Sequence, residues 1–476
     1  MDIFIALILL FAIPAYFFKS VRTSSRIFFI FSALHLAASL LPFFCAKTFP
    51  FVFRIPSLFL PMGLYADGLS CYALLIESLV LFAAAWYNMD FVLRREEEPY
   101  QKKSPLYHAS LIGFVGAMDL AILSDNLGMV WVFIELSTLL SALLIAHHGS
   151  AHSLEATWKY VFICSVGIAF AFAGIVFLLI ATGGELNMSI LEFDKSKLFA
   201  VKIALPFLII GFGTKAGLAP VHNWLPDAHS EAPTPVSALL SASLLNSAIL
   251  PIVRVIHLTE GTGLENFAAV ILMTMGFLSI TVAAVFISHA YNFKRMLAYS
   301  SVENMGILAI AFAVNCKTGF LLHMAGHSLI KCALFLTAGN ILSLYGTKLI
   351  KDVRGMVRIH KPLAYIFLIG ILAIMGFVPF VLFASEFMVI AALFAYNKFL
   401  CVLFIVLLTV IMYGLGKNML MMVRGEPSIN QSGYKFNISA VAPIILLLVL
   451  AALLFMTVIY FGIIDGGFSG LTGWIK

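Results

Sequence analysis

A single lysine lies inside an apolar run and is followed closely by four prolines. Lys215 belongs to the stretch GFGTKAGLAPVHNWLPDAHSEAPTPVSALL. A charge at membrane depth costs between about 2.5 and more than 10 kcal/mol, depending on how closely water or a partner approaches it. The prolines that follow are Pro220, Pro226, Pro233 and Pro235. Proline interrupts a helix, and non-helical backbone is tolerated at that depth only when buried in protein or lining a wet cavity. The stretch therefore predicts an ion site beside a broken helix.

Three titratable side chains recur at every fourth position of TGFLLHMAGHSLIKCALFL. His323, His327 and Lys331 share one face of a helix at this spacing. Because histidine titrates near neutral pH, the stripe predicts a proton wire through the membrane. Two histidines four residues apart can also share a zinc ion, and helix packing alone is an alternative role for His323. No glutamate lies between the histidines and no third ligand is nearby, which favours the proton wire over a metal site.

Two glutamates lie in apolar segments and are candidates for proton transfer. Glu135, in WVFIELSTLL, has Lys215 two spans later as its candidate cation. Such a pair can load and release a proton, and a structural ion pair that pins two helices is the alternative. Glu386 follows a second interruption, GFVPFVLFASEF. It is expected to end the wire, or to be a helix-start residue favoured by the helix dipole.

Four further polar residues have less definite assignments. His222 and His229 flank the first interruption, and we expect them either to feed Lys215 or to bind the backbone groups freed there. Asp119 is expected at a membrane interface, whereas Glu77 lies in an apolar span without an identifiable partner.

Composition defines the class of protein. Of 476 residues, 62% are hydrophobic and 11% are charged, against about 25% charged residues in an average soluble domain. This is a polytopic membrane protein. The net charge of +6 is spread over loops, and no nucleic-acid motif is present, so the charge argues for topology and lipid contact rather than for binding of nucleic acid.

The cysteines argue against a metal cofactor held by this chain. The six cysteines are isolated, and no CxxC or Cys/His cluster occurs. Neither an iron–sulfur cluster nor a nickel site is therefore expected, and no cofactor is predicted. The first residues, MDIFIALILLFAIPAYFFK, predict an uncleaved first span because an acid replaces the basic region of a signal peptide.

Fourteen apolar runs approach the length of roughly 20 residues that a membrane span needs. The seventh, at about 201–229, and the twelfth, at about 362–396, are broken. Loops after odd-numbered spans carry most of the lysine and arginine, which predicts that these loops are cytoplasmic and that both termini lie on the outer face of the cell membrane.

The two broken spans suggest an internal repeat. Five spans separate them, and an odd offset inverts the second unit relative to the first. The expected fold is all-α, with two inverted five-helix repeats. The expected domains are an N-terminal three-helix unit, two antiporter-like repeats and a C-terminal helix, at residues 1–105, 106–258, 259–424 and 425–476.

Several stretches together resemble one protein family. WVFIEL, the stretch around Lys215, KRMLAYSSVENMG, HMAGHSLIKCALFLTAG and GFVPFVLFASEF resemble the antiporter-like membrane subunits of respiratory complex I, Mrp-type cation/proton antiporters and group 4 membrane-bound [NiFe] hydrogenases. The match covers about residues 106–424. SLEATWKYVFICSVGIAFAFAG and YSSVENMG are most similar to the hydrogenase-4 component F and formate hydrogenlyase branch.

The resemblance implies roles for the charged residues. It implies a central polar axis, with Glu135 and Lys215 in a first half-channel. Lys331 and Glu386 would belong to the second half-channel, with His327 as a relay. Redox chemistry in partner subunits would drive the ion movement.

The chain departs from many complex I relatives at two places. Asn246 replaces a lysine of the eighth span, and Glu303 and Asn304 follow AYSS where a histidine is frequent. Asparagine can hold water in a hydrogen-bonded chain but cannot carry a proton. A bridge between the two halves is therefore expected to depend on water or on Glu303.

The leading hypothesis is a proton-translocating, non-enzymatic subunit of a membrane-bound hydrogenase or complex I-like assembly. Its expected partners are other membrane subunits, a peripheral redox arm, the lipid bilayer and protons. A Na+/H+ antiporter module is an alternative, as is a structural paralogue that no longer conducts and is best supported by Asn246.

Overall fold

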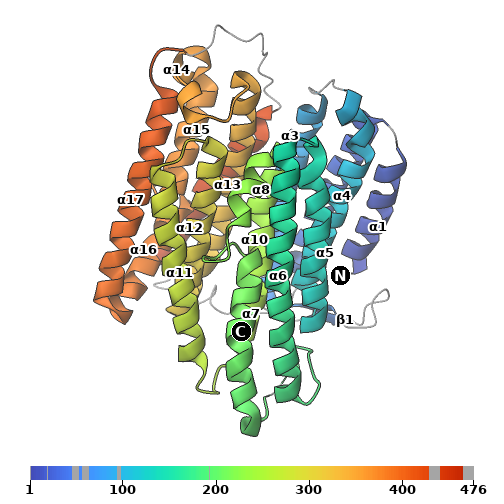
Figure 1. The fold of residues 1–476 in the computed structure, drawn as a ribbon, viewed down its shortest axis with the longest axis vertical. Helices are drawn as coiled ribbons and strands as arrows, with labels where there is room; N and C mark the ends of the chain where they lie inside the picture. The colour runs from blue at the N-terminus through green and yellow to red at the C-terminus, as the bar shows by residue number, and fades with distance from the viewer. Residues whose placement is uncertain are drawn as a thin grey trace.

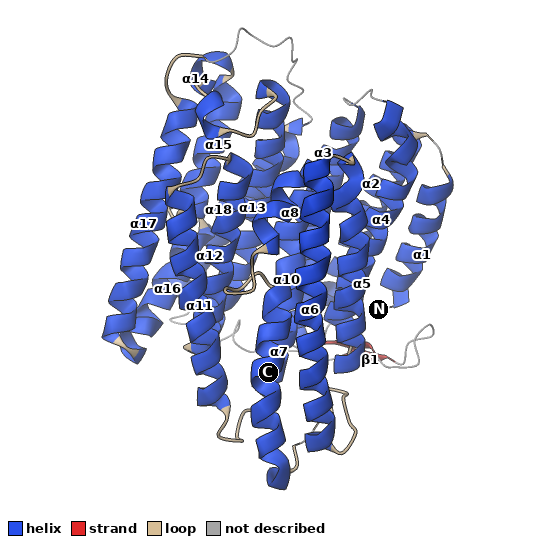
Figure 2. Ribbon diagram, viewed as in Figure 1, coloured by secondary structure: helices blue, strands red, loops and turns tan. Residues whose placement is uncertain are grey.

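The computed structural model describes residues 2–18, 20–45, 53–55, 64–93, 98–191, 193–427 and 440–464. Almost all of this is helical (Figures 1 and 2). The helices are α1 (Asp2–Phe17), α2 (Val21–Cys45), α3 (Gly68–Leu93), α4 (Glu98–Leu123), α5 (Leu127–Ile145), α6 (Ala151–Thr182), α7 (Leu198–Lys215), α8 (Trp224–Glu231), α9 (Thr234–Leu239), α10 (Leu245–Leu258), α11 (Glu265–Ser288), α12 (Phe293–Ala313), α13 (Lys317–Tyr345), α14 (Met356–Ile359), α15 (Lys361–Ile374), α16 (Val381–Tyr396), α17 (Lys398–Val423) and α18 (Ala442–Ile464).

Short elements complete the chain. Three 3₁₀ turns are η1 (Ala146–His148), η2 (Lys195–Lys197) and η4 (Ile350–Asp352), and η3 (Leu240–Leu244) is a π-helix. The strands β1 (Phe53–Ile55) and β2 (Leu64–Ala66) form an antiparallel hairpin beside the bundle, with Arg54 opposite Tyr65.

The number of membrane spans agrees with the sequence. Twelve helices of the described chain are long and apolar enough to cross a membrane. One of them, Thr234–Leu258, combines α9, η3 and α10. The shorter α1 and the broken pair α15–α16 add two further spans, so the prediction of an all-α polytopic protein with about fourteen spans is confirmed. The predicted domain boundaries remain a prediction, and parts of the last domain lie outside the described residues.

Helix α13 lies at the centre of the bundle. It packs against α3, α9, α12, α15, α16 and α18, and its residues from Gly319 to Ile341 are all buried. In Figure 1 the N-terminal helices α1–α5 lie on one side of it and α15–α17 on the other. The polar stripe predicted on this helix is therefore held away from lipid.

The two broken spans have the same backbone at the break. Gly217 follows the end of α7 and Gly376 follows the end of α15, and both have positive φ, at 76° and 68°. The next amide in each case bonds a carbonyl five residues earlier, Leu218 to Gly213 and Phe377 to Leu372. This is a Schellman-type helix end, for which glycine is favoured because a side chain strains the left-handed conformation. Each break then continues into a second helix segment, α8 or α16.

Candidate functional site

Lys215 is the last residue of α7 and is fully buried. Its Nζ donates hydrogen bonds to Thr138 Oγ1 at 2.7 Å and to the Tyr160 hydroxyl at 2.5 Å. The ammonium also lies 4.6 Å from the centre of the Tyr160 ring and 5.9 Å from that of Trp224. Hydroxyls and aromatic faces, together with the negative end of the helix dipole, replace the water that the charge loses.

Glu135 lies on α5 and interacts electrostatically with Lys215, but no hydrogen bond or ion pair joins them in the described part of the chain. Its Oε1 accepts from the Ser165 hydroxyl of α6 at 2.8 Å, and its buried Oε2 has no partner. The structural ion pair considered from sequence is thus not formed. Glu135 and Lys215 are electrostatic neighbours, and of their proton-binding atoms only Glu135 Oε2 is without a partner.

Lys331, also fully buried, is held by helix α12. Its Nζ donates to the carbonyl of Leu297 at 2.7 Å and makes a short hydrogen bond to the Ser300 hydroxyl. Glu303 follows one turn later on α12, interacts electrostatically with Lys331, and has a buried Oε2 without a partner. Glu303 is therefore the carboxylate next to the second lysine.

Glu386 lies beyond the second break, on α16. Its carboxylate lies against Gly376, so that a methyl group at this glycine would collide with it. Glu386 interacts electrostatically with Glu303, and no ion pair to it occurs in the described ranges. Lys331, Glu303 and Glu386 therefore form a series in the second half, with the possible relay Glu303 in the middle.

The two histidines of the predicted stripe point to different neighbours of α13. His327 Nε2 donates to the carbonyl of Ser241 at 3.3 Å, so its Nδ1 is the unprotonated nitrogen. His323 Nδ1 lies 3.0 Å from the Ser385 hydroxyl, which already donates to Leu382. His323 must therefore donate from Nδ1. The other ring nitrogen of each histidine is buried and has no hydrogen-bond partner.

His229 lies on α8, at the junction of the two halves. Its Nδ1 donates to the carbonyl of Ser237 at 3.2 Å, and its Nε2 is buried without a partner. Its ring stacks on Phe335 of α13 at 5.1 Å and lies 6.5 Å from Trp224, which borders Lys215. It interacts electrostatically with Lys331 and His327. His229 thus connects the surroundings of Lys215 with those of Lys331.

Asn246 and Asn304 are the two amide side chains considered from sequence as possible relays. Asn246 donates from Nδ2 to the Ser328 hydroxyl of α13 at 2.6 Å, and Asn304 donates to the carbonyl of Ser300 at 2.6 Å. The carbonyl oxygen of each amide is buried and unpartnered. Both are therefore places where a water molecule can be held.

The π-helix η3 supplies the acceptors that fix this junction. Its carbonyls at Ser241 and Ala242 accept from His327 and Ser328 on α13, and Ala242 also accepts from Asn246. In a π-helix the regular bonding pattern is displaced, and such turns are frequent at functional sites. Nothing in the letters LSASL predicted this.

His222 is less closely connected to the axis. It is 5% exposed, its ring lies edge-on to Tyr299 at 6.3 Å, and its Nδ1 is unpartnered. The structure therefore places it beside the first break without a bond to Lys215.

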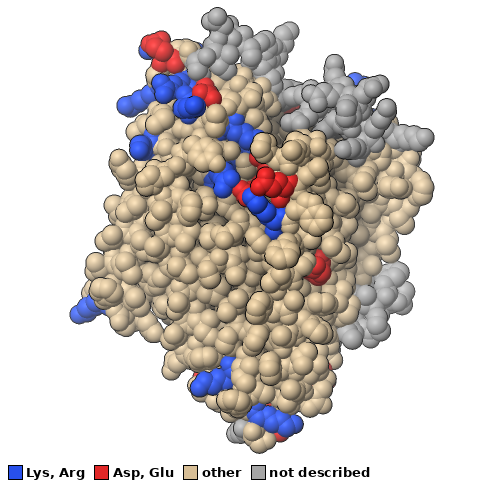
Figure 3. Space-filling model, viewed as in Figure 1, with Lys and Arg blue, Asp and Glu red and all other residues tan. Residues whose placement is uncertain are grey.

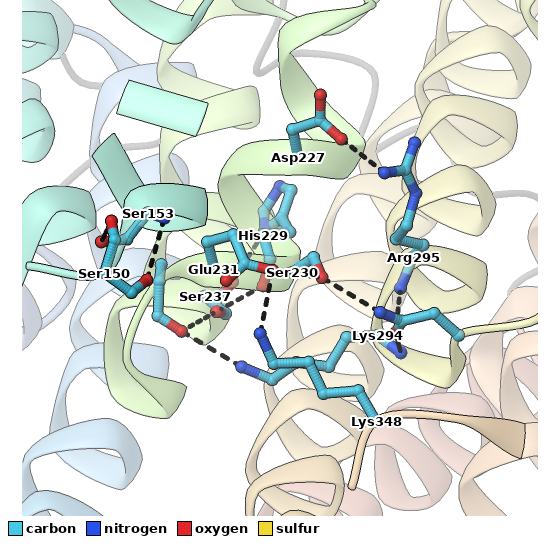
Figure 4. Close-up of polar contacts among 12 residues, drawn as sticks. Ser150, Ser153, Asp227, His229, Ser230, Glu231, Ser237, Lys294, Arg295 and Lys348 are labelled. Atoms are coloured by element: carbon cyan, nitrogen blue, oxygen red, sulfur yellow. Dashed lines mark hydrogen bonds and ion pairs between the residues drawn. The ribbon is translucent and has the colours of Figure 1, made fainter. Parts of the chain in front are cut away.

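A polar cavity of about 340 Å³ opens between α6, α8 and α12. Its lining includes His152, Glu155, Lys159, Asp227, Glu231 and Arg295. Figure 3 shows a charged patch near the middle of this face, apart from the further charged groups at the upper left and at the lower end. Figure 4 shows that α8 carries both Asp227, bound to Arg295 at 2.6 Å, and Glu231, bound to Lys348 at 2.9 Å, with His229 between them in the chain. Sequence reasoning missed this cavity because its walls are distant in sequence.

The remaining partners of the two lysines were also missed. These partners are common residue types that lie far from the lysines in sequence, so no sequence pattern identifies them as partners. They are Thr138, Tyr160 and Ser300. No group of three or more His, Cys, Asp or Glu residues in the described ranges can hold a metal ion. His323 and His327 instead make hydrogen bonds to Ser385 and to the carbonyl of Ser241.

Comparison with known proteins gives one consistent group. The family model "NADH:quinone oxidoreductase/Mrp antiporter, TM" matches residues 124–412. The hydrogenase-4 component F homolog of Methylacidiphilum infernorum is 35% identical over 74% of this chain and 78% of its own length.

Two further proteins, one matched by sequence and one by structure, are also similar to this chain. Hydrogenase-4 component B of Escherichia coli is 29% identical over 73% of this chain, which spans only 53% of that longer relative. In structure, the chain is similar to a chain of the Mrp complex from Dietzia sp., with a TM-score of 0.85, 18% identity and coverage of 100% of this chain and 97% of the other.

Proposed function

Because the chain belongs to the NADH:quinone oxidoreductase/Mrp antiporter transmembrane family, we propose that its buried titratable residues conduct protons as one path through both halves. The chain is an antiporter-like membrane subunit of the type found in complex I-like, hydrogenase and Mrp assemblies. The proposed order is Glu135, Lys215, His229, His327, Lys331, Glu303 and Glu386, with His323, Asn246, Asn304 and His222 beside it.

One observation supports this proposal above all others. His229, His327 and His323 each have one ring N–H fixed by a hydrogen bond and the other nitrogen buried and open. A histidine that serves only for packing gains nothing from an unsatisfied buried nitrogen, which costs about 1–3 kcal/mol. A relay requires such a nitrogen, because the proton must be accepted on one side and released on the other.

The cavity beside α8 is the proposed access from the aqueous phase. It contains the ion pairs of Asp227 and Glu231, and His229 follows on the same helix. Arg295 lines it, and Lys348 and Lys294 bond to Glu231 and to the carbonyl of Ala232 at the end of the same helix. By the positive-inside rule this end is cytoplasmic, which would place both termini on the outer face.

We further propose that the chain is not itself an enzyme and that redox subunits drive the proton movement. The likeness to hydrogenase-4 components supports a membrane-bound hydrogenase or complex I-like complex. Other membrane subunits and a peripheral redox arm would be its partners.

The experiment is vesicle transport by the assembled complex. With Lys215→Ala or Glu386→Ala, we expect both turnover-linked proton uptake and coupled turnover to fall. If both stay at the level of the unmodified complex, the proposal is wrong. A sodium requirement of the uptake would instead favour the antiporter alternative, and full assembly without any uptake by the unmodified complex would favour the structural paralogue.

A further inference from the structure

A second cluster of buried titratable groups lies outside the proposed path, among α2, α3 and α4. It consists of His35, Glu77, Ser78 and Asp119, which are at most 2% exposed. All four precede residue 124, where the family match begins. Asp119, which the sequence was expected to place at a membrane interface, is fully buried inside the protein and bonded to His35 at 2.9 Å.

The hydrogen bonds determine where the protons of the His35–Asp119 pair lie. The Ser78 hydroxyl donates to the carbonyl of Leu74 at 2.6 Å, so it can only accept from His35 Nδ1, 2.8 Å away. Nδ1 therefore carries a hydrogen. The contact between His35 Nε2 and Asp119 Oδ2 then requires one more proton between them. Whichever atom holds it, the pair has no net charge.

Glu77 has no such compensation. Both of its carboxylate oxygens are buried without a hydrogen-bond partner, and the charged group with which it interacts is Asp119, a second acid. Ionised Glu77 would be a bare charge beside an already neutral pair, at a cost of several kcal/mol. Asp119 Oδ1 is also buried and unpartnered, so three carboxylate oxygens remain open in one place.

Among the residues that the structure describes, no cation bonds to this cluster; Arg254 of α10, which donates to the carbonyl of Ile122 on α4, is paired with Asp67 instead. From α1, the ring of Phe4 packs on His35 at 4.9 Å, and within α2 the ring of Phe31 does so at 5.7 Å. The titratable group of α4 on the same side, His108, is bonded to Asn88 and to its own helix. Lys331 of α13 is bonded to α12.

The position of Glu77 along α3 relates the cluster to the polar residues of α13. Helix α3 touches α13 twice around it, through the Tyr72 hydroxyl on the carbonyl of Leu321 and through Cys332 Sγ at the carbonyl of Val80. Glu77 lies between these two contacts on α3. It is therefore at the depth of the stripe from His323 to Lys331, in the neighbouring helix.

We propose that Glu77 and Asp119, with His35, form a second proton-binding site, in which Glu77 holds a proton that exchanges with water through the unpartnered Asp119 Oδ1. The ligand is a proton rather than a metal ion, since no group of three or more metal-ligating side chains of suitable geometry occurs among the described residues. The site goes beyond the proposed path, because it uses none of its residues.

Infrared spectroscopy of the full-length chain in liposomes tests this. At neutral pH we expect Glu77→Gln, which keeps the shape of the side chain, to remove one carboxylic acid C=O band, and Asp119→Asn to shift that band. The band should move when H₂O is replaced by D₂O. Glu155→Gln is the control, because Glu155 is 60% exposed and paired with Lys159; the band should stay.

Three results would overturn the proposal. They are an unchanged carboxylic acid band in Glu77→Gln, a band that does not respond to D₂O, and loss of the band from the unmodified chain when Na+ is added at constant pH, which would make the ligand a sodium ion. None of them depends on transport through Lys215, so this site and the proposed function can fail separately.

Discussion

The two halves of the chain share a broken helix but differ in what each break does with its acid. Counting from the glycine of each break, Asp227 in the first half corresponds to Glu386 in the second. Asp227 is neutralised by Arg295 at 2.6 Å and by Lys159 at 3.4 Å. Glu386 lies against Gly376 beside Glu303, without an ion pair in the described part of the chain.

This difference indicates that the acids at the two breaks have different roles. In the first half the acid at the break belongs to a charged cavity at the surface, and the buried Lys215 is surrounded by hydroxyls and rings. In the second half the acids remain inside, next to Lys331. We therefore propose that the same kind of helix break gives one half an aqueous access and the other half a buried proton acceptor.

Removal of Lys215 should have the largest effect. With Lys215→Met we expect proton uptake by vesicles of the assembled complex to fall by about 100-fold, the lower end for loss of a positioned proton donor. Lys202→Met is the matched control, because Lys202 lies on the same helix but is exposed. Equal uptake by the two variants would remove Lys215 from the path.

The acids at the two breaks should respond differently. Glu386→Gln should lower proton uptake by more than about tenfold, because the amide cannot take up a proton. Asp227→Asn should mainly weaken the contact of α8 with α12, at a cost of about 1 kcal/mol measured as a lower unfolding temperature. Loss of uptake in Asp227→Asn and its retention in Glu386→Gln would reverse the assignment.

Asn246 should matter less, since His229 offers a separate connection between the halves. Asn246→Leu removes the hydrogen bond to Ser328, and we expect proton uptake to fall about two- to tenfold, the equivalent of one hydrogen bond. Ser247→Ala is the neighbouring control, because that hydroxyl bonds only the carbonyl of Leu244 in its own helix. A loss as complete as that of Lys215→Met would make Asn246 the obligatory bridge.

The two break glycines should show the smallest effects, on stability. Gly217→Ala and Gly376→Ala place a side chain at positive φ, at about 1–2 kcal/mol each. Both should lower the unfolding temperature. Only Gly376→Ala should also reduce proton uptake, because its methyl group would displace the Glu386 carboxylate, whereas that of Gly217→Ala meets Leu225. Equal uptake by both would contradict this.

The sequence predicted the parts of this structure that depend on local pattern. The apolar runs predicted the spans. Glycine and proline residues predicted both breaks, because a helix end with positive φ restricts which residue types can occupy it. The stripe from His323 to Lys331 was also evident, since α13 is a regular helix.

The rest depends on contacts between distant segments. Tyr160 and Thr138 lie 55 and 77 positions from Lys215, and His35 lies 84 positions from Asp119. Hydroxyl residues are frequent in membrane helices, so their identity alone does not mark a partner. The sequence likewise gave His229 no definite role, because its position at the junction results from the packing of α8 against α13.

The central claim is that a proton crosses between the halves at His229, and proton uptake by sealed vesicles containing the His229→Gln complex tests it most directly. Glutamine keeps a hydrogen-bond donor for Ser237 but cannot be protonated. We predict that the complex assembles, that the unfolding temperature is nearly unchanged and that proton uptake is lost. Uptake at the level of the unmodified complex would show that the two halves conduct without His229 and would contradict the account.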